Sequence, residues 1–295
     1  MKITNNLNLP QAIVNAVTND PYDSSGSDIS VTRLIAPPRI RVLEARNWDL
    51  LTDDVGDRIF SLLGQSVHHV IERAKGKDDL AEQRLFVKND DTQGWTLSGQ
   101  FDYLTAKDGE LIDFKTTSAW SALDALSNGK DEWEQQLNLL DYLVRHSPEV
   151  THEVHSLQIL AILRDWSKLR VMQSDSYPRK QVVMIPIRRW TPEEQSQYVR
   201  ERIKAHQDAE KTTELPVCSP KERWNKPDSY AVMKDGRKTA ARVLPSKEAA
   251  EEWLSSNNMV NGVKCQIVLR KGEDVRCQNY CRVNEFCSHF MGVSF

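Results

Sequence analysis

The sequence predicts an α/β protein with a small α+β lobe at its C-terminal end, and three observations support this. Strand-like and helix-like segments alternate over the first 215 residues. After Pro216 the elements become shorter. Three of the five cysteines lie in the last nineteen residues. We therefore expect a flexible N-terminal arm over 1–29, a core over 30–215, and a cysteine-clamped lobe over 216–295.

The composition is that of an ordinary globular protein, with 39% hydrophobic and 27% charged residues. The net charge of −3 confines any nucleic-acid surface to a local patch. No apolar run approaches the length of a membrane span, and Met1 to Asn6 lack a signal pattern. We expect a cytoplasmic protein with no membrane partner. In such a protein, an odd cysteine count favours metal or cluster ligation over disulfides.

A β-hairpin is expected at the centre of the core. Residues 95–105 alternate apolar and polar side chains, 107–109 form a turn, and 110–116 return. On the return strand Asp113 and Lys115 share one face, and Asp102 of the outgoing strand can approach it. Two carboxylates and a lysine are suited to a hard divalent cation and a water or phosphate oxygen beside it.

A helix is predicted over 53–74, where apolar residues recur at helical spacing. It carries His68 and Glu72, which share a face because they are four residues apart. If His68 faces the carboxylates of the hairpin, it is a further metal ligand, one that favours manganese alongside magnesium. The alternative is a solvated polar face with an incidental histidine.

A second helix is predicted over 131–145 and carries Gln136. It follows the strand of Asp113 and Lys115 by about twenty residues, so the Gln136 amide could orient the site or hold a nucleic-acid backbone. A glutamine on the surface of an amphipathic helix is the alternative interpretation.

Taken in order, these motifs resemble a known family. They are Gly-x-x-x-His-x-x-x-Glu from Gly64, Gly-x-x-Asp from Gly99, Asp-x-Lys-Thr from Asp113, and the helix that bears Gln136. The order is similar to that of the RecB-type branch of the PD-(D/E)XK nucleases, above all those of bacteriophages and prophages. The resemblance covers residues 30–290. It implies a restriction-endonuclease-like core, a mixed central sheet flanked by helices, which hydrolyses DNA phosphodiesters with Mg²⁺ or Mn²⁺.

The resemblance also implies roles for individual residues. The implied metal ligands are His68, Asp102, Asp113 and the backbone carbonyl of Phe114. The implied catalytic residues are Asp102, Asp113, Lys115 and Gln136, with Glu72, Glu82 and Tyr142 in supporting places. The chain departs from the family pattern four residues after Gln136, where Leu140 stands in place of a tyrosine. That departure bears on the role of Tyr142 and not on the metal site.

The cysteines form a second signal. Cys277, Cys281 and Cys287 are closely spaced and need a fourth ligand for a tetrahedral or four-iron site; Cys218 in a preceding loop is the expected one. Cys265 precedes an apolar strand and is expected to be structural. The arrangement resembles the [4Fe-4S] clamp of AddB-type and CRISPR-adaptation nucleases, with altered spacing. Zinc, with His289 as a substitute ligand, is the alternative.

Three segments pair cations with aromatic rings, as single-strand binding surfaces do: Arg188-Arg189-Trp190, Arg164 with Trp166, and Lys221 to Trp224. Surface ion pairs and tryptophan packing explain each of them equally simply. By family analogy the expected partner is DNA, single-stranded or with free ends, together with phage recombination or replication proteins.

The sequence thus predicts a metal-dependent deoxyribonuclease, an exonuclease or end-processing enzyme, in recombination, replication or repair. Two alternatives stay open at this point. One is a non-catalytic DNA-binding or partner-binding protein that keeps the fold and the cluster. The other is a regulator that uses the cluster as a redox sensor.

Overall fold

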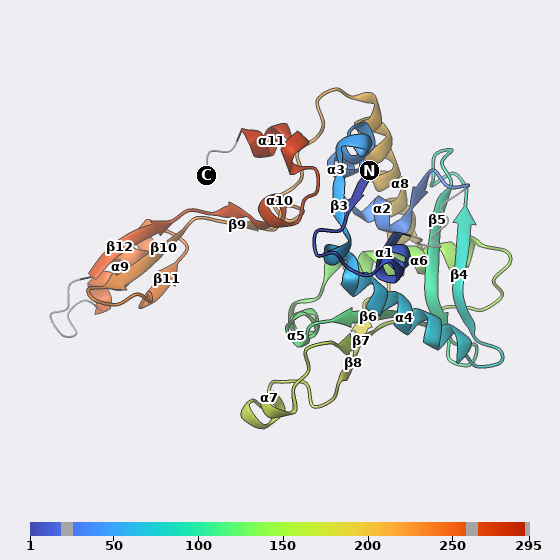
Figure 1. Cartoon of the computed structure of the whole chain (residues 1–295), viewed down its shortest axis with the longest axis horizontal. Coiled ribbons are helices and arrows are strands. Elements are labelled where there is room, and N and C mark those ends of the chain that lie inside the picture. Colours follow the sequence, from blue (N-terminus) through green and yellow to red (C-terminus); the bar gives the residue numbers. More distant parts are fainter. Residues whose placement is uncertain (19–25, 258–264, 293–295) are drawn as a thin grey trace. The chain divides into compact units, whose positions relative to one another are not determined.

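The computed structural model describes residues 1–18, 26–257 and 265–292, which divide into two compact units (Figure 1). The larger unit comprises Met1–Arg41 and Trp48–Glu214, and the smaller comprises Val42–Asn47 and Leu215–Phe295. The division after Glu214 lies one residue from the predicted boundary. The smaller unit also takes in part of α3 (Pro38–Arg46), which the sequence did not indicate.

The larger unit is built on a six-stranded mixed sheet flanked by helices. The strand order is β2-β5-β6-β7-β8, with β4 paired to β5. Strands β4, β5 and β6 are antiparallel, β6 and β7 are parallel, and β7 and β8 are antiparallel. The bounds are β2 Ile29–Ser30, β4 Leu80–Val87, β5 Leu97–Leu104, β6 Glu110–Thr117, β7 Ser156–Leu163 and β8 Val182–Ile187. The α/β class and the hairpin of β5 and β6 are as predicted.

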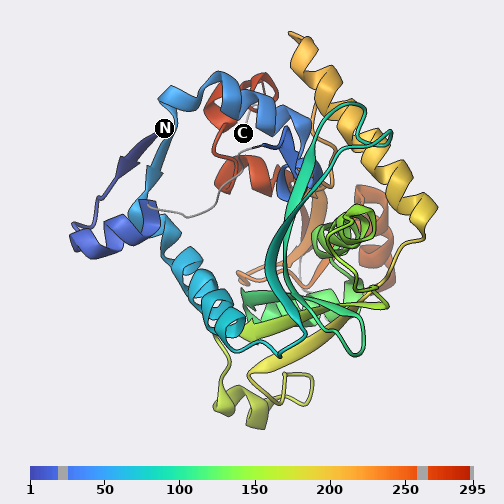
Figure 2. The same ribbon diagram turned by 90° about the vertical axis from the view of Figure 1, so that its right-hand side faces the viewer.

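Helix α6 (Asp131–His146) lies across the sheet and contacts strands β4 to β8, and α2 (Val31–Ile35) and α8 (Pro192–Lys211) pack against it. Figure 2 shows β4 and β5 as a long curved pair with α6 and α8 alongside. Helix α5 (Ala119–Asn128) precedes α6, and α7 (Lys168–Gln173) lies between β7 and β8. The buried apolar side chains of these elements form one continuous core.

The hairpin of β5 and β6 opens soon after its turn, and this opening positions the site. The two strands pair only at Tyr103–Ile112 and Leu104–Leu111, whereas β5 stays paired with β4 along its whole length. Asp102 is the first residue of β5 beyond the last pair with β6. Gly99 lies further along β5, where a Cβ atom would approach Leu143 and Val31 to within 2.8 Å. The helices therefore pack directly on the glycine backbone.

The N-terminal region differs from the predicted flexible arm. Residues of β1 (Lys2–Thr4) pair in parallel with β3 (Thr52–Asp54), and α1 (Gln11–Thr18) follows. The Asp54 carboxylate accepts hydrogen bonds from the Thr4 hydroxyl and the Asn6 amide, at 2.7 and 2.9 Å. The prediction of a flexible arm is therefore wrong for residues 2–18. Residues 19–25 of that arm lie outside the described part of the chain.

The first long helix also differs from the prediction. A 3₁₀ turn (Val55–Arg58) precedes α4, which runs from Ile59 to Arg73. No residue of α4 is buried, and Phe60 and Val70 are 61% and 54% exposed. Helical spacing of apolar residues predicted the helix correctly but does not report how far it is buried. The apolar residues of α4 stay partly exposed because the helix contacts only one side of β4, β5 and β6.

The C-terminal unit has its own small sheet. Strand β10 (Ser229–Lys234) lies between β11 (Arg242–Leu244) and β12 (Cys265–Arg270), and α9 (Lys247–Asn257) packs on them. A two-stranded pair joins β9 (Asn225–Lys226) to β13 (Glu273–Asp274). The short helices α10 (Val275–Asn279) and α11 (Ser288–Met291) flank a 3₁₀ turn at Asn284–Phe286. In the described residues of both units, no helix has the length and apolar character needed to cross a membrane.

Candidate functional site

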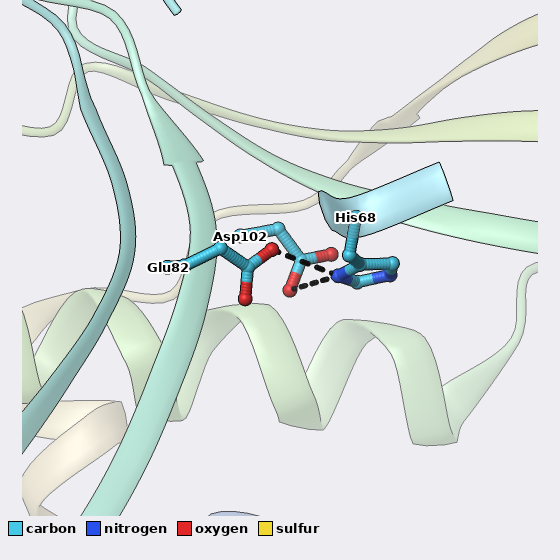
Figure 3. Close-up of side chains that lie close together, drawn as sticks. All are labelled: His68, Glu82 and Asp102. Carbon is cyan, nitrogen blue, oxygen red and sulfur yellow. Dashed lines mark hydrogen bonds and ion pairs between the residues drawn. The ribbon is translucent and has the colours of Figure 1, made fainter. Parts of the chain in front are cut away.

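A histidine and two carboxylates converge where β5 leaves β6 (Figure 3). His68 Nδ1 lies 2.9 Å from Glu82 Oε1 and 3.6 Å from Asp102 Oδ1. One ligand atom from each of the three residues lies within 4.8 Å of the other two. They come from α4, β4 and β5. His68 thus faces Asp102, as the metal-site prediction requires. Glu82, which was expected only to support the site, lies closer to His68 than Asp102 does.

Strand geometry brings Glu82 and Asp102 together. The pairs Ala81–Tyr103 and Gln83–Phe101 flank them in the ladder of β4 and β5, so Glu82 stands opposite Asp102. Glu82 has a φ of 52°, a backbone conformation that non-glycine residues seldom adopt. Such outliers persist only where surrounding structure holds them, and they concentrate at functional sites.

Backbone atoms of Phe114 complete this group. The Phe114 amide donates a hydrogen bond to Asp102 Oδ2 at 2.7 Å, across the gap where the two strands have stopped pairing. Its carbonyl oxygen lies 3.2 Å from His68 Nε2. The Phe114 ring meets the His68 ring edge-on, with centroids 6.1 Å apart. The carbonyl predicted to assist metal binding is therefore at the histidine.

The oxygens at this site raise the pKa of His68, and burial raises that of Asp102. Both ring nitrogens of His68 face oxygen acceptors, and the hydrogen bond to Glu82 raises its pKa to about 9. Burial raises the pKa of Asp102 to about 8, and the negative charge of Asp113 acts in the same direction. Crowded oxygens in a poorly solvated place favour positive charge. The protonated imidazole supplies it here, and a metal ion is the natural replacement.

Asp113, Lys115 and Gln136 form a second group beside the first. Lys115 Nζ lies 2.7 Å from Asp113 Oδ2 and donates to Gln136 Oε1 at 3.1 Å. Gln136 Nε2 in turn donates to Asp113 Oδ1 at 2.8 Å. The three side chains therefore fix one another. Gln136 therefore lies at the site, in agreement with the interpretation that its amide orients the site and not with the interpretation that it is a surface residue.

The buried oxygens test whether a divalent cation fits. Asp113 is 1% exposed, and its Oδ2 atom receives no hydrogen bond of good geometry within the described residues, although the Lys115 ammonium is close. The ammonium, 2.7 Å away, already supplies the positive charge that this buried oxygen needs, so the fit of a metal depends on the types of donor present. Carboxylates, a carbonyl and one imidazole suit manganese and magnesium. The donor set fits.

Two predicted supporting residues lie elsewhere. Glu72 is paired with His69 at 3.8 Å. The Tyr142 hydroxyl is hydrogen-bonded to Asn89 and Asp91. No motif pointed to Gln100, which donates to Glu82 Oε2 at 2.6 Å and orients that carboxylate. Its position inside the Gly-x-x-Asp motif, between Gly99 and Asp102, could have indicated that it belongs to the site.

The four cysteines predicted to hold a cluster are close enough to act on one another electrostatically, and none of them forms a disulfide within the described residues. Burial raises the pKa of Cys218 to about 12, and the charges of Cys277, Cys281 and Cys287 act in the same direction. Among the described residues, no three of these sulfurs all lie within 4.8 Å of one another. Tetrahedral zinc would draw its thiolates to about 3.8 Å apart, given Zn–S bonds of about 2.3 Å. An iron–sulfur cube holds them farther apart.

Hydrogen bonds around Asp274 hold the two cysteine-bearing stretches together. Its carboxylate accepts from Arg223 Nε at 2.8 Å and from Asn225 Nδ2 at 2.7 Å. Arg223 also donates to the carbonyl of Cys218. His289 Nε2 lies 3.3 Å from Asp274, so this nitrogen of the alternative zinc ligand is engaged. Cys265 lies on β12, apart from the four, as expected.

The three segments that pair cations with aromatic rings do not form a free basic channel. Arg189 makes two hydrogen bonds to the buried Asp141 carboxylate, and Arg188 pairs with Glu134 and Glu194. The remaining members are engaged likewise. Arg164 lies over Phe60, the Trp166 indole donates to Pro178, and Trp224 lies under Arg276. These contacts are the surface ion pairs and tryptophan packing that were the alternative to a single-strand binding surface.

Comparison with known proteins identifies no family. No family model matches the chain, and no curated protein matches it. One solved structure, described as "Crystal structure of SSO0001", is similar at 15% identity, covering 68% of this chain and 87% of that one with a TM-score of 0.45. At that level the likeness decides nothing about fold or function.

Proposed function

We propose that this protein is a divalent-metal-dependent deoxyribonuclease with a restriction-endonuclease-like core. The observation that supports this best is the convergence of His68, Glu82 and Asp102 beside the group of Asp113, Lys115 and Gln136. The first group suits a hard cation, and the second offers an ammonium to an anion next to it. A phosphodiester needs both, because its negative charge repels the attacking water.

A bound Mg²⁺ or Mn²⁺ would neutralise charge on the phosphate and lower the pKa of a water molecule. His68, Glu82, Asp102 and the Phe114 carbonyl would hold it, with Asp113 on the side of Lys115. An ammonium group has three N–H donors. Lys115 directs hydrogen bonds to Asp113 and Gln136, which leaves one donor for a phosphate oxygen or the attacking water. Gln136 keeps the lysine oriented for this.

The proposal includes a [4Fe-4S] cluster on Cys218, Cys277, Cys281 and Cys287, with zinc as the alternative. The four cysteines lie in the C-terminal unit and the carboxylates in the larger one, and four cysteines are the usual ligand set of such a cluster, which favours a structural role. A brown protein with broad visible absorbance and bound iron supports it. A colourless protein with stoichiometric zinc rejects it.

Free cysteines and a DNA substrate fit a cytoplasmic protein, in the host cytoplasm if the chain is phage-encoded. Phage recombination or replication proteins are its proposed partners.

Cleavage of labelled linear and circular DNA, single- and double-stranded, tests the function. We expect degradation of linear single strands with Mn²⁺ or Mg²⁺ and none with EDTA. Asp113→Asn should remove the activity, whereas Asp108→Asn in the turn of the same hairpin should keep it. Equal cleavage by Asp113→Asn and the parent protein would refute the assignment, and absence of any DNA cleavage by the parent would refute the function.

A further inference from the structure

A second lysine lies near the proposed catalytic lysine, and no motif indicated it. Lys130 is the residue before the first turn of α6, the helix that carries Gln136. Its ammonium lies 4.3 Å from the centre of the Trp133 ring, one turn before Gln136. Gln136 accepts from Lys115, so the two lysines flank one short stretch of helix. Their charges repel, since Lys115 contributes to a lowered pKa of Lys130, after the larger effect of burial.

Lys130 has few partners for a half-buried ammonium. Among residues 1–18, 26–257 and 265–292, its side chain has one hydrogen bond, to the Ser121 hydroxyl at 3.4 Å. Glu132 and Asp124 act on it through space, but within the described residues no carboxylate forms an ion pair with it. Lys115, by contrast, has Asp113 beside it. A lysine pair with one carboxylate partner leaves an unmatched positive charge, which is suited to an anionic ligand.

An exposed indole adjoins, in sequence, the hydrogen-bond partner of this cation. Trp120 is 74% exposed and lies in the first turn of α5, beside Ser121 and three residues after the end of β6. Burying such a ring is favourable when a flat partner covers it, and unpaired bases stack on aromatic rings in this way. A cation for phosphate and a ring for a base are the two parts of a single-strand binding subsite.

We propose that Lys130, Ser121 and Trp120 form a subsite for the nucleotide next to the scissile phosphate. Lys130 and the Ser121 hydroxyl bind its phosphate, and the Trp120 indole stacks on its base. This inference rests on the proposed nuclease function and adds to it the residues that select an unpaired strand. The ligand class is a single-stranded DNA backbone with at least one unstacked base.

Binding of a fluorescent single-stranded oligonucleotide in EDTA, at several NaCl concentrations, separates the two parts. For Lys130→Met we expect affinity to fall about 5- to 10-fold and the slope of log affinity against log salt to become shallower by about 0.7. Lys130→Arg should bind within about twofold of the parent because the charge remains. Trp120→Ala should weaken binding about 5- to 100-fold with an unchanged salt slope.

The matched control is Lys107→Met, in the turn before β6, whose first residue Glu110 lies about 17 Å along the strand from Lys115. It should keep the parental affinity and slope. If Lys130→Met does not fold, Lys130→Gln gives the same reading of the slope, since it keeps a polar contact to Ser121.

Parental binding and slope in the Lys130 and Trp120 variants of an active enzyme would overturn the subsite and leave the nuclease function standing. A parent protein that neither binds nor cleaves DNA would overturn both. Loss of cleavage in Lys130→Met with unchanged binding and slope would also reject the phosphate contact.

Discussion

In the larger unit, the candidate ligands are carried by long strands and helices around one continuous core, whereas in the C-terminal unit four cysteines are carried by short helices and loops. Asp102 and Asp113 are 7% and 1% exposed and are fixed by hydrogen bonds from the protein. In the described residues of the smaller unit, the buried apolar side chains are few: Val42, Leu43, Ala231, Val232, Ala250, Val283 and Cys287. The comparison teaches that the first group of side chains is held by the protein itself, and it leads us to expect that the second needs a bound metal to fold.

The largest effect is expected from Lys115→Met, which tests whether the preformed site is catalytic. Removing the one free donor should lower kcat about 10²- to 10³-fold. The buried Asp113 carboxylate also loses the ammonium 2.7 Å away, so the melting temperature should fall as well, although the Gln136 amide still donates to Asp113. Steady-state cleavage and thermal unfolding measure the two, and Lys107→Met is the control. A cleavage rate equal to that of the parent would remove Lys115 from the mechanism.

Cys287→Ser tests the other half of the comparison. Loss of one thiolate should release the bound metal and unfold the C-terminal unit, because little apolar burial remains to hold it. The larger unit should persist as a protease-resistant fragment. Iron and zinc content and limited proteolysis report this, and Cys265→Ser should behave as the parent. Unchanged protease resistance in Cys287→Ser would show that the small unit folds without its metal.

His206 gives the larger unit a predicted pH dependence of stability. It is fully buried, accepts a hydrogen bond from Arg41 Nε and donates to the Leu34 carbonyl; burial lowers its pKa to about 4. The unfolded chain binds this proton near pH 6.5 and the native one only near pH 4. The contribution of His206 to stability should therefore be full above pH 6.5 and fall by about 2–3 kcal/mol as the pH drops towards 4.

Denaturant unfolding between pH 4 and 7 measures this dependence. His206→Gln should flatten the curve in that range, whereas His69→Gln, at an exposed position of α4, should leave it intact. An unchanged pH dependence in His206→Gln would assign the effect to other groups.

Gly99→Ala is expected to have the smallest effect of this series. The added methyl group would lie 2.7 to 2.9 Å from Leu143, Val31 and Leu140, so the packing must shift. Overpacking of this kind costs about 1–3 kcal/mol. The matched control is Gly94→Ala, where nothing lies within 4 Å but φ is 86°, so that variant reports backbone strain alone. Equal stability of Gly99→Ala and the parent would show that the side chains of the packed helices move aside without cost.

The two regions also differ in how much of them the sequence could predict. The hairpin and the order of strands and helices are local patterns, and the structure contains them, whereas the cysteine cluster stays a prediction. Glu82 was harder to place, since its position depends on the register of β4 against β5 and on an unusual φ. The exposed face of α4 and the pairing of β1 with β3 depend on tertiary contacts that periodicity does not report. Lys130 carries no motif at all.

The most direct test of the account is the binding of Mn²⁺, followed by electron paramagnetic resonance or calorimetry. We expect the parent protein to bind Mn²⁺, His68→Ala and Glu82→Gln to bind it at least about tenfold more weakly, and Cys287→Ser to retain the affinity of the parent. That result would locate the hard cation in the larger unit, apart from the cysteines. Equal Mn²⁺ binding by the parent and His68→Ala, or no binding by the parent, would contradict the central claim.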